Sequence, residues 1–382
     1  MIDTIAIMLS RDMYTVIDHD RFTPSTRELY SRPNQLLGDN RFLTYVQNPT
    51  SYDKKNGIYK PRLTITIRKR RNFGHEINMK VELSVPKLLF GENFSEITDA
   101  DLDRFLNKLK TVLASMGVIV SASKLSEANI SSIHYGKNVV LTDYTTPNLY
   151  LLELNRLDVN GKLDVNQTDF RNGGHSWKVH ANSYEIAFYD KRQDLERSKI
   201  SDKRSIERDN YIQLDLFEKQ TVMKPFEVLR MEARLNSRRK IKHTLDQVGV
   251  YVYPSLSGLF KQKIAQKVCL YFLHELTSGW FPIIAEADID LGQVFLRLKT
   301  ANPHVQPRKL LQLITAASII KNSGASALRQ MLQPSKPSVW YDLKRDLQSL
   351  NSPKPRVSPF MPIELALKTF TPLKLQDYME TV

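Results

Sequence analysis

The stretch Arg62-Leu63-Thr64-Ile65-Thr66-Ile67-Arg68 alternates polar and apolar side chains without a break. Because successive side chains of a β-strand point to opposite faces, the leucine and the two isoleucines would share one face and the polar residues the other. The stretches Ile77–Val85 and Val228–Leu235 show the same alternation. Alternation this regular predicts an antiparallel sheet with one covered face and one open, polar face.

Further strands and helices are expected on either side of these stretches. Strand-like runs occupy residues 1–9, 42–46, 130–135, 176–181 and 183–189, and a helix begins near Thr98 with apolar residues at helical spacing. Residues 190–210 are charged and compatible with a helix, and the chain becomes helical after about residue 245. The pattern predicts an α+β fold, with a mainly antiparallel sheet and helices on one face. We expect a nuclease-like domain over residues 1–245 and a helical accessory domain over residues 246–382.

The composition points to a polyanionic partner. Among 382 residues, 55 Lys and Arg face 41 Asp and Glu, a net charge of +14. Such a surplus favours nucleic acid over an anionic membrane, because no apolar run approaches the roughly 18–20 residues of a membrane span. A single cysteine, Cys269, excludes a disulfide framework or a cysteine–zinc cluster and suggests a reducing cytoplasm.

A tyrosine closes one of the predicted strands. Tyr189 follows the apolar run Ile186–Phe188 and precedes Asp190-Lys191-Arg192. It can be an amphipathic ring at a strand end, or a nucleophile whose pKa is lowered by the two cations. Tyr184 lies five residues earlier, so on a regular strand it faces the opposite side.

Three residues on predicted polar strand faces are candidate metal ligands: Glu82, His134 and Glu232. If their strands are neighbours, the three form a mixed oxygen and nitrogen site suited to Mg²⁺ or Mn²⁺. Such an ion polarises a phosphate oxygen. Together with the basic flanks and the tyrosine, the set points to phosphodiester transesterification. Taken alone, a carboxylate at such a position is usually just solvated, and a single histidine is more often a hydrogen-bonded structural residue than a ligand.

Basic residues gather in three places. We expect these residues to contact DNA phosphates. They are Arg68, Arg70 and Arg71 at a hairpin tip, Arg230, Arg234, Arg238, Arg239 and Lys240 in and after the stretch Val228–Leu235, and Lys344 and Arg345 in the tail. The tail segments 325–332 and 338–347 could form a helix-turn-helix. An ordinary helical bundle with Trp340 in its core fits the same pattern.

Six stretches carry a resemblance when they are taken in order along the chain. They are Met1–Asp3, Val81–Gly91, Ile130–Tyr135, Phe188–Lys191, Leu229–Leu235 and Ser338–Tyr341. The ordered set resembles the rolling-circle replication initiators of filamentous phages (the gene II and gene X group) and, more distantly, trans-type plasmid initiators. The resemblance implies a rearranged HUH-endonuclease-like fold. It also implies a nickase that attacks one DNA strand through a tyrosine, stays linked to the 5′ phosphate and leaves a 3′-OH primer.

The resemblance assigns roles by position: Tyr189 is the nucleophile, Lys191 its cationic neighbour and Glu232 a metal ligand. His134-Tyr135-Gly136 holds one histidine where the wider superfamily has a His-x-His strand. No G-x-x-x-x-G-K-[ST] loop occurs, so a host helicase would unwind the DNA and a single-strand-binding protein would take up the displaced strand. The alternatives are a non-catalytic origin-binding protein or repressor, and a relaxase or transposase with the same tyrosyl chemistry.

Overall fold

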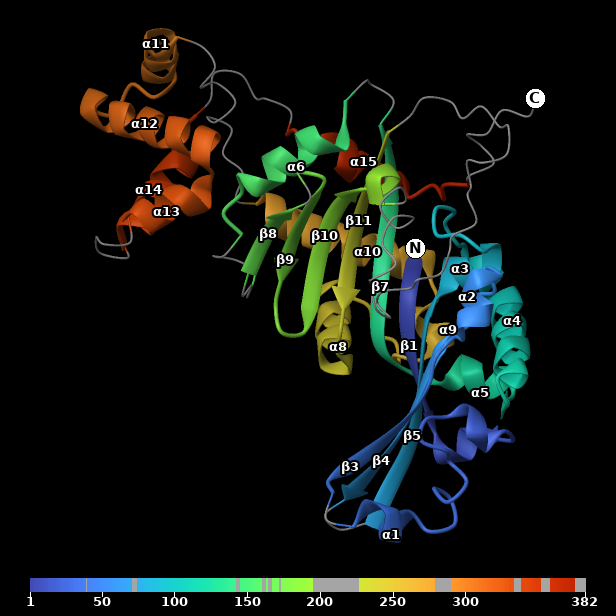
Figure 1. Ribbon diagram of the computed structural model, residues 1–382. Coiled ribbons are helices and arrows are strands. Elements are labelled where there is room, and N and C mark those ends of the chain that lie inside the picture. Colours follow the sequence, from blue (N-terminus) through green and yellow to red (C-terminus); the bar gives the residue numbers. More distant parts are fainter. Residues whose placement is uncertain are drawn as a thin grey trace, which may run out of the picture.

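The computed structural model describes residues 1–38, 40–70, 74–141, 145–159, 163, 167–171, 173–194, 227–278, 290–332, 338–351 and 358–374. Nine strands in these ranges form one sheet in the order β3-β4-β5-β1-β7-β11-β10-β9-β8, and each neighbouring pair is antiparallel (Figure 1). The strands are β1 (Ile2–Ser10), β3 (Phe42–Gln47), β4 (Arg62–Arg70), β5 (Gly74–Ser84), β7 (Asn129–Leu141), β8 (Gln167–Arg171), β9 (Ser176–His180), β10 (Tyr184–Asp190) and β11 (Glu227–Leu235). A separate pair joins β2 (Tyr14–Val16) to β6 (Val118–Val120).

Helices fill the segments between and after the strands. They are α1 (Pro33–Leu37), α2 (Ser51–Lys55), α3 (Val85–Phe90), α4 (Leu102–Ser115), α5 (Ala122–Glu127), α6 (Pro147–Asn155), α8 (Arg238–Gln247), α9 (Leu256–Leu259), α10 (Gln262–Thr277), α11 (Leu291–Ala301), α12 (Pro307–Ser323), α13 (Ala325–Leu332), α14 (Ser338–Ser349) and α15 (Met361–Thr369). Short 3₁₀ turns lie at Arg11–Met13, His19–Arg21 and Asp99–Asp101.

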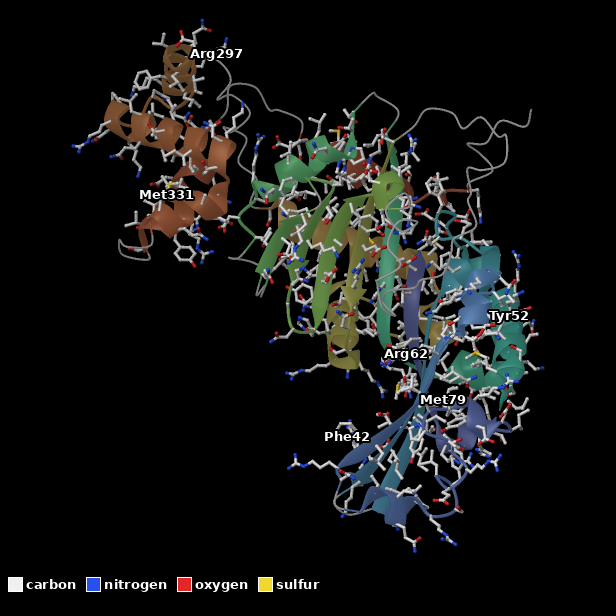
Figure 2. The ribbon with its side chains drawn as sticks, viewed as in Figure 1. Phe42, Tyr52, Arg62, Met79, Arg297 and Met331 are labelled. Atoms are coloured by element: carbon white, nitrogen blue, oxygen red, sulfur yellow. The ribbon has the colours of Figure 1, made fainter. Side chains whose placement is uncertain are left out.

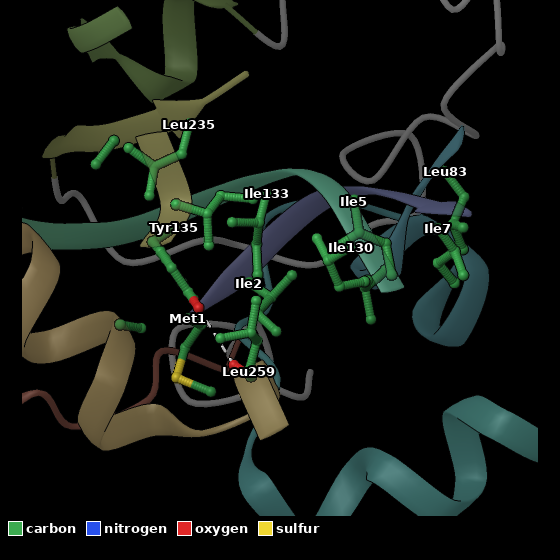
Figure 3. Packing of buried hydrophobic residues seen from close by; sticks show 14 of the residues in the cluster. Met1, Ile2, Ile5, Ile7, Leu83, Ile130, Ile133, Tyr135, Leu235 and Leu259 are labelled. Carbon is green, nitrogen blue, oxygen red and sulfur yellow. Dashed lines mark hydrogen bonds between the residues drawn. The ribbon is translucent and has the colours of Figure 1, made fainter. Parts of the chain in front are cut away.

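Helices cover one face of the sheet, as the alternation predicts, but Arg230 and Glu232 on the polar face are also buried. Helix α10 lies behind β7 and β11 in Figure 1, and its Phe272 stacks on Tyr184 of β10 with ring centroids 5.7 Å apart. Near the N-terminus the same face packs Ile2 and Ile5 of β1 against Ile133 of β7 (Figure 3). We call the opposite face, which carries the polar residues of these strands, the open face.

Strands β3, β4 and β5 form an arm that extends beyond the end of β1 (Figure 1). Pairing between β1 and β5 ends at Ser10 and Asn78, so residues 74–77 of β5 continue past β1 with β4 alone beside them. The arm buries Leu63, Ile65 and Ile67 completely on its covered face. The apolar residues of the stretch Arg62–Arg68 therefore belong to the core, as predicted.

The buried apolar residues form two cores. The first core contains the covered face of the sheet together with α8, α9, α10 and, from the end of the chain, α15. The second core joins α11, α12, α13 and α14, which we call the helical unit. Helices α8–α10 thus pack with the sheet although they follow residue 245. The domain boundary at residue 245 remains a prediction.

The expected α+β fold with a large antiparallel sheet and a helical C-terminal region is confirmed. Most of the helix expected over residues 190–210, and the linker at 333–337 between the two tail helices, lie outside the described residues. None of the described helices is long and apolar enough to cross a membrane.

Candidate active site on the open face

The pairing of β10 with β11 brings Tyr189 close to Glu232. Tyr189 on β10 pairs with Arg230 on β11, while Glu232 pairs with Ala187 on one side and with Gly136 of β7 on the other. Alternation then places Tyr189, Arg230, Glu232 and Arg234 on the open face. Tyr184 lies on the covered face and is buried there, as the five-residue spacing predicts.

A hydrogen bond of 2.6 Å runs from the Tyr189 hydroxyl to Oε1 of Glu232. The Glu232 carboxylate also accepts from two arginines: Nε of Arg230 lies 2.7 Å from Oε1, and Nε of Arg234 lies 2.8 Å from Oε2. Tyr189 is partly buried, whereas the Glu232 and Arg230 side chains are only 3% and 4% exposed. Both carboxylate oxygens are therefore occupied.

A second layer of side chains fixes the two arginines. Arg230 contacts Asp3 of β1 at 2.9 Å and donates to Asn138 of β7 at 3.0 Å. Arg234 donates to Oε1 of Glu185 at 2.6 Å. Gly136 makes room for the side chains of Arg230 and Glu232, because a Cβ there would lie 3.1 Å from the Arg230 guanidinium and 3.3 Å from Cγ of Glu232.

The charge chain extends further along β9 and β8. His180 lies 2.8 Å from Oε2 of Glu185 through Nδ1 and 3.1 Å from Asp169 through Nε2. Four charged or titratable groups, from Asp169 to Arg234, thus form one line that ends at Glu232. We call the set Asp3, His134, Asn138, Glu185, Tyr189, Arg230, Glu232 and Arg234 the open-face cluster.

Electrostatics in the cluster favour a neutral tyrosine and an ionised glutamate. Burial and the adjacent Glu232 charge raise the pKa of Tyr189 well above its ordinary value, against the opposing effect of Arg230. Burial would raise the pKa of Glu232, but Arg234, Arg230 and the Tyr189 hydrogen bond hold it well below its usual range. The resting site therefore holds a phenol beside a carboxylate.

The expected effect of Lys191 on Tyr189 needs correction. The Lys191 side chain is only 1% exposed, its Nζ lies 5.8 Å from the Tyr189 ring centroid, and it pairs with Asp194 at 3.7 Å. Burial, followed by repulsion from Arg230, lowers the pKa of Lys191. Arg192 is turned toward Glu227 at 3.7 Å. The two cations after Tyr189 thus do not make it a phenolate here.

The three candidate metal ligands do not meet at one point. His134 on β7 lies opposite Arg234 of β11, two residues along from Glu232, and burial lowers its pKa. Glu82 is on β5, with β1 and β7 between it and Glu232, and it pairs with Lys80 at 2.8 Å. Across three strand spacings of about 4.8 Å, Glu82 is at least about 14 Å from the Glu232 strand.

The donor set was also compared with the needs of a divalent ion. Within the described ranges, no group of three His, Cys, Asp or Glu side chains is arranged to hold a metal. In addition, both Glu232 oxygens are engaged by guanidinium groups. This arrangement does not fit a Mg²⁺ or Mn²⁺ ion shared by Glu82, His134 and Glu232, so the metal remains a prediction and no step below depends on it.

The basic residues expected to contact DNA differ in accessibility. Arg68 and Arg239 are exposed, whereas Arg230 is buried in the cluster and Arg234 is partly buried. Arg70 forms a 2.6 Å hydrogen bond with Glu76, and Arg71 lies outside the described residues.

The remaining cations expected to bind DNA lie near α8 and in α14. Arg238 is exposed and donates to the Tyr253 hydroxyl at 3.1 Å, while Nζ of Lys240 lies over the Tyr184 ring. Lys344 is 12% exposed and pairs with buried Asp158, whereas Arg345 is exposed beside Asp342. Trp340 is buried, as the helical-bundle alternative expects.

Sequence reasoning missed four members of the site. Asp3, Asn138 and Glu185 hold the two arginines in place. Gly136 leaves room for the Arg230 and Glu232 side chains. Asp3 and Glu185 do sit at polar positions of predicted strands, but only the strand order shows that they face Arg230 and Arg234. Comparisons of the chain with protein-family models, with curated proteins and with solved structures give no match.

Proposed function

We propose that this protein is a site-specific single-strand DNA endonuclease and strand transferase that initiates rolling-circle replication through Tyr189. The observation that carries the proposal is the 2.6 Å hydrogen bond from the Tyr189 hydroxyl to Glu232, flanked by two guanidinium groups. It supplies a nucleophile, a proton acceptor and two phosphate-binding cations in one place. The net charge of +14 suits a DNA substrate.

The proposed reaction exchanges one phosphoester bond for another. The Tyr189 oxygen attacks the phosphorus, a P–O bond to tyrosine forms, and the bond from phosphorus to the 3′ oxygen of the preceding nucleotide breaks. The phenolic proton passes to Glu232, and the departing 3′ oxygen takes a proton from water to become the 3′-OH. Glu232 then releases its proton to the resulting hydroxide, so the step neither gains nor loses a proton. The number of phosphoester bonds is conserved, so no nucleotide cofactor is required. Religation is the reverse of this step.

A DNA phosphate and Glu232 compete for the same two arginines. This competition would raise the pKa of Glu232 only when DNA is bound. In the resting site Arg230 and Arg234 hold the pKa of Glu232 low. A phosphodiester attracts the same guanidinium groups, because bidentate phosphate pairing is among the strongest contacts of arginine. As their contacts shift to phosphate, Glu232 regains proton affinity beside the Tyr189 hydroxyl.

The test is to incubate the protein with supercoiled DNA carrying its origin, with Mg²⁺ or Mn²⁺ supplied. We expect nicked circles with a protein-linked 5′ end, and peptide mass spectrometry should place the adduct on Tyr189. Tyr189→Phe should lose nicking and adduct while binding the origin normally. Tyr184→Phe is the matched control and should retain most activity, because that ring lies on the covered face, where it packs against Phe272 beneath Lys240. An adduct on another residue would overturn the role of Tyr189.

A second candidate is a binding protein without catalysis. The observation that favours it is the complete pairing of the cluster, since Glu232, Arg230 and Arg234 are all saturated with internal partners. A buried polar network of this kind can be purely structural. Origin binding without any nick or adduct, under either metal, would favour an origin-binding protein or repressor. Nicking followed by transfer to a second DNA would instead indicate a relaxase or transposase.

The resemblance suggests further parts of the proposal. A rearranged HUH-like arrangement of the sheet, a bacterial cytoplasmic setting, and a host helicase and single-strand-binding protein as partners all follow from it. A pull-down from host extract on a nicked origin, with Tyr189→Phe as the control, would detect the helicase.

A further inference from the structure

The open face of the arm carries an exposed aromatic ring beside an exposed cation. Phe42 on β3 is 56% exposed and lies directly opposite Arg68 of β4, which is also exposed. Figure 2 labels Phe42 at the outer edge of the arm. Among the described residues Arg68 forms no ion pair, although it lies near enough to Glu76 to lower the pKa of that carboxyl.

Hydrogen-bonding groups without partners lie further along the same face. Nε of Arg62, Oγ1 of Thr64 and Oε2 of Glu82 are buried atoms that have no partner within the described part of the chain. Arg62 and Glu82 are cross-strand neighbours in β4 and β5, and Figure 2 places Arg62 where the arm joins the rest of the sheet. Buried polar atoms normally have a hydrogen-bond partner, so these three can pair with a ligand once their side chains turn toward it.

The arm and the open-face cluster belong to one surface. The pairings Ser132 with Ala6, and Ala6 with Glu82, put the polar rows of β7 and β5 on the same face. From Tyr189 to Phe42 the path crosses β11, β7, β1, β5 and β4. At about 4.8 Å per strand and about 3.3 Å per residue, the two side chains lie up to roughly 50 Å apart, less where the sheet twists.

We infer that the open face of the arm binds single-stranded DNA that flanks the scissile phosphate, with Phe42 stacking on a base and Arg62 and Arg68 contacting phosphates. This inference rests on the proposed function, because a scissile phosphate exists only if the protein cleaves DNA. A span of roughly 50 Å corresponds to about fifteen nucleotides at the 3.4 Å rise of one strand, and to fewer if the strand is extended.

The chemistry of the arm favours a single strand over a duplex. A ring can stack on a base only when the face of that base is accessible, as in single strands. The open face of the arm also offers hydroxyl and amide groups, at Thr44, Thr64, Thr66 and Asn78, among its cations. Stacking of a base on an aromatic ring is tolerant of sequence. The arm would therefore add affinity, while the choice of origin lies elsewhere.

The experiment measures fluorescence anisotropy of labelled oligothymidylates of 8, 20 and 30 nucleotides on the full chain, in a Tyr189→Phe background that prevents cleavage. We expect affinity to rise between 8 and 20 nucleotides. Phe42→Ala should remove most of that rise and weaken 20-mer binding by roughly 5- to 100-fold, the effect of losing one stacked base. Arg68→Gln should reduce the salt slope by about 0.7, the value for one phosphate contact on a single strand.

Two matched controls sit on other elements. Tyr52→Ala removes a ring from α2 that is 70% exposed, and Lys110→Gln removes an exposed cation from α4. Neither should change 20-mer affinity by more than about twofold. Thermal unfolding of every variant shows whether the arm is intact. If Phe42→Ala and Arg68→Gln match the controls, the arm does not bind DNA.

Two other outcomes separate the competing explanations. If a 20-base-pair duplex binds more tightly than the 20-mer and loses as much affinity in Phe42→Ala, the single-strand inference is wrong. If wild-type protein never nicks its origin but the arm variants still lose 20-mer affinity, the proposed function fails while DNA binding by the arm stands. Normal nicking with unchanged 20-mer affinity in both variants overturns the arm alone.

Discussion

Nε1 of Trp340 donates a hydrogen bond of 3.2 Å to Oδ2 of Asp158, which ties α14 of the helical unit to the segment that follows α6. The Asp158 side chain is fully buried and also meets Nζ of Lys344 at 3.1 Å and the Arg329 guanidinium at 3.5 Å. Nearby, the backbone N–H of Ala325 donates to the carbonyl of Arg156 at 3.0 Å. One carboxylate therefore neutralises two cations between the helical unit and the sheet-bearing part of the chain.

Replacing Asp158 should loosen the helical unit. Asp158→Ala leaves Lys344 and Arg329 without a counter-ion and Trp340 without an acceptor, and breaking a buried pair in this way costs about 3–5 kcal/mol. We expect faster amide hydrogen exchange and earlier proteolysis in α13 and α14. Asp342→Asn is the control, because its exposed pair with Arg345 should contribute no more than about 1 kcal/mol. Equal protection in both variants would contradict the anchoring role of Asp158.

The basic residues of α8 should contribute unequally to DNA binding. Arg238 and Arg239 are exposed, whereas Nζ of Lys240 lies 4.0 Å from the Tyr184 ring centroid, so part of its charge is already engaged. Arg238→Gln with Arg239→Gln should lower the slope of log affinity against log salt by up to about 1.8 on duplex DNA. Lys240→Gln should change that slope little. A salt titration of origin binding compares the three, and an unchanged slope in the double variant would make α8 a solvated helix only.

Glu185 should act on catalysis as a positioning residue for Arg234. It holds the guanidinium from the side opposite Glu232, at 2.6 Å. Glu185→Gln weakens that contact, and a small misplacement of a catalytic cation can reduce the rate by up to about 100-fold. We expect single-turnover nicking to slow by roughly 10- to 100-fold while origin affinity stays constant. Glu185→Asp should recover part of the rate.

The matched control for Glu185 is Glu227→Gln. Glu227 pairs loosely with Arg192 at 3.7 Å on the same sheet, and its side chain is 38% exposed. Its replacement should leave nicking unchanged. If Glu185→Gln instead lowers origin affinity and leaves the single-turnover rate intact, Glu185 supports binding and not the chemical step.

The capping box of α2 should make stability depend on pH. Burial would raise the pKa of Asp53, but the bond from Lys60 and the hydrogen bonds from Thr50 lower it below 3.8. Because the folded pKa is depressed, the stabilisation is complete above the unfolded pKa of about 3.9 and is lost as the pH falls through the folded value.

Denaturant unfolding of Asp53→Asn checks this. At pH 7 the variant should be about 1.5–3 kcal/mol less stable, the contribution of hydrogen bonds to a charged group. The difference from wild type should shrink as the pH falls below about 4. A difference that is constant from pH 7 to pH 3 would show that the Asp53 charge does not matter.

The sequence predicts the strands well and their spatial order poorly. Alternation over residues 62–68 and 228–235 has a period of two that sheet formation requires, so those strands and their covered faces could be predicted locally. The same reasoning puts Glu232 on a polar face, and it puts Tyr184 and Tyr189 on opposite faces of their strand without showing which of them faces Glu232. It could not show that β10 pairs with β11 in the register that brings the two together, because strand order depends on contacts distant in sequence.

The predictions that differ from the structure share this physical origin. Glu82 and Glu232 occupy the same face of the sheet, but alternation does not show how far apart two residues on one face lie. Two strands, β1 and β7, separate the strand of Glu82 from that of Glu232. Lys191 follows a strand within a charged run, which normally indicates a solvated segment, yet it is buried. Lys344 has the spacing of an exposed helix position, and only the fold brings Asp158 beside it.

The return of the chain from the helical unit to the first core changes how the protein can be divided. The helical unit is an insertion, since α10 before it and α15 after it both pack in the first core, with Phe360, Ile363, Leu367 and Phe370 all buried there. Cutting the chain before residue 290 would strip those four side chains from the core and expose the apolar surface they cover. Deleting residues 279–357 and joining the ends through a short linker keeps them. The two tethers also confine the helical unit, so any DNA it holds stays at a high local concentration near the sheet.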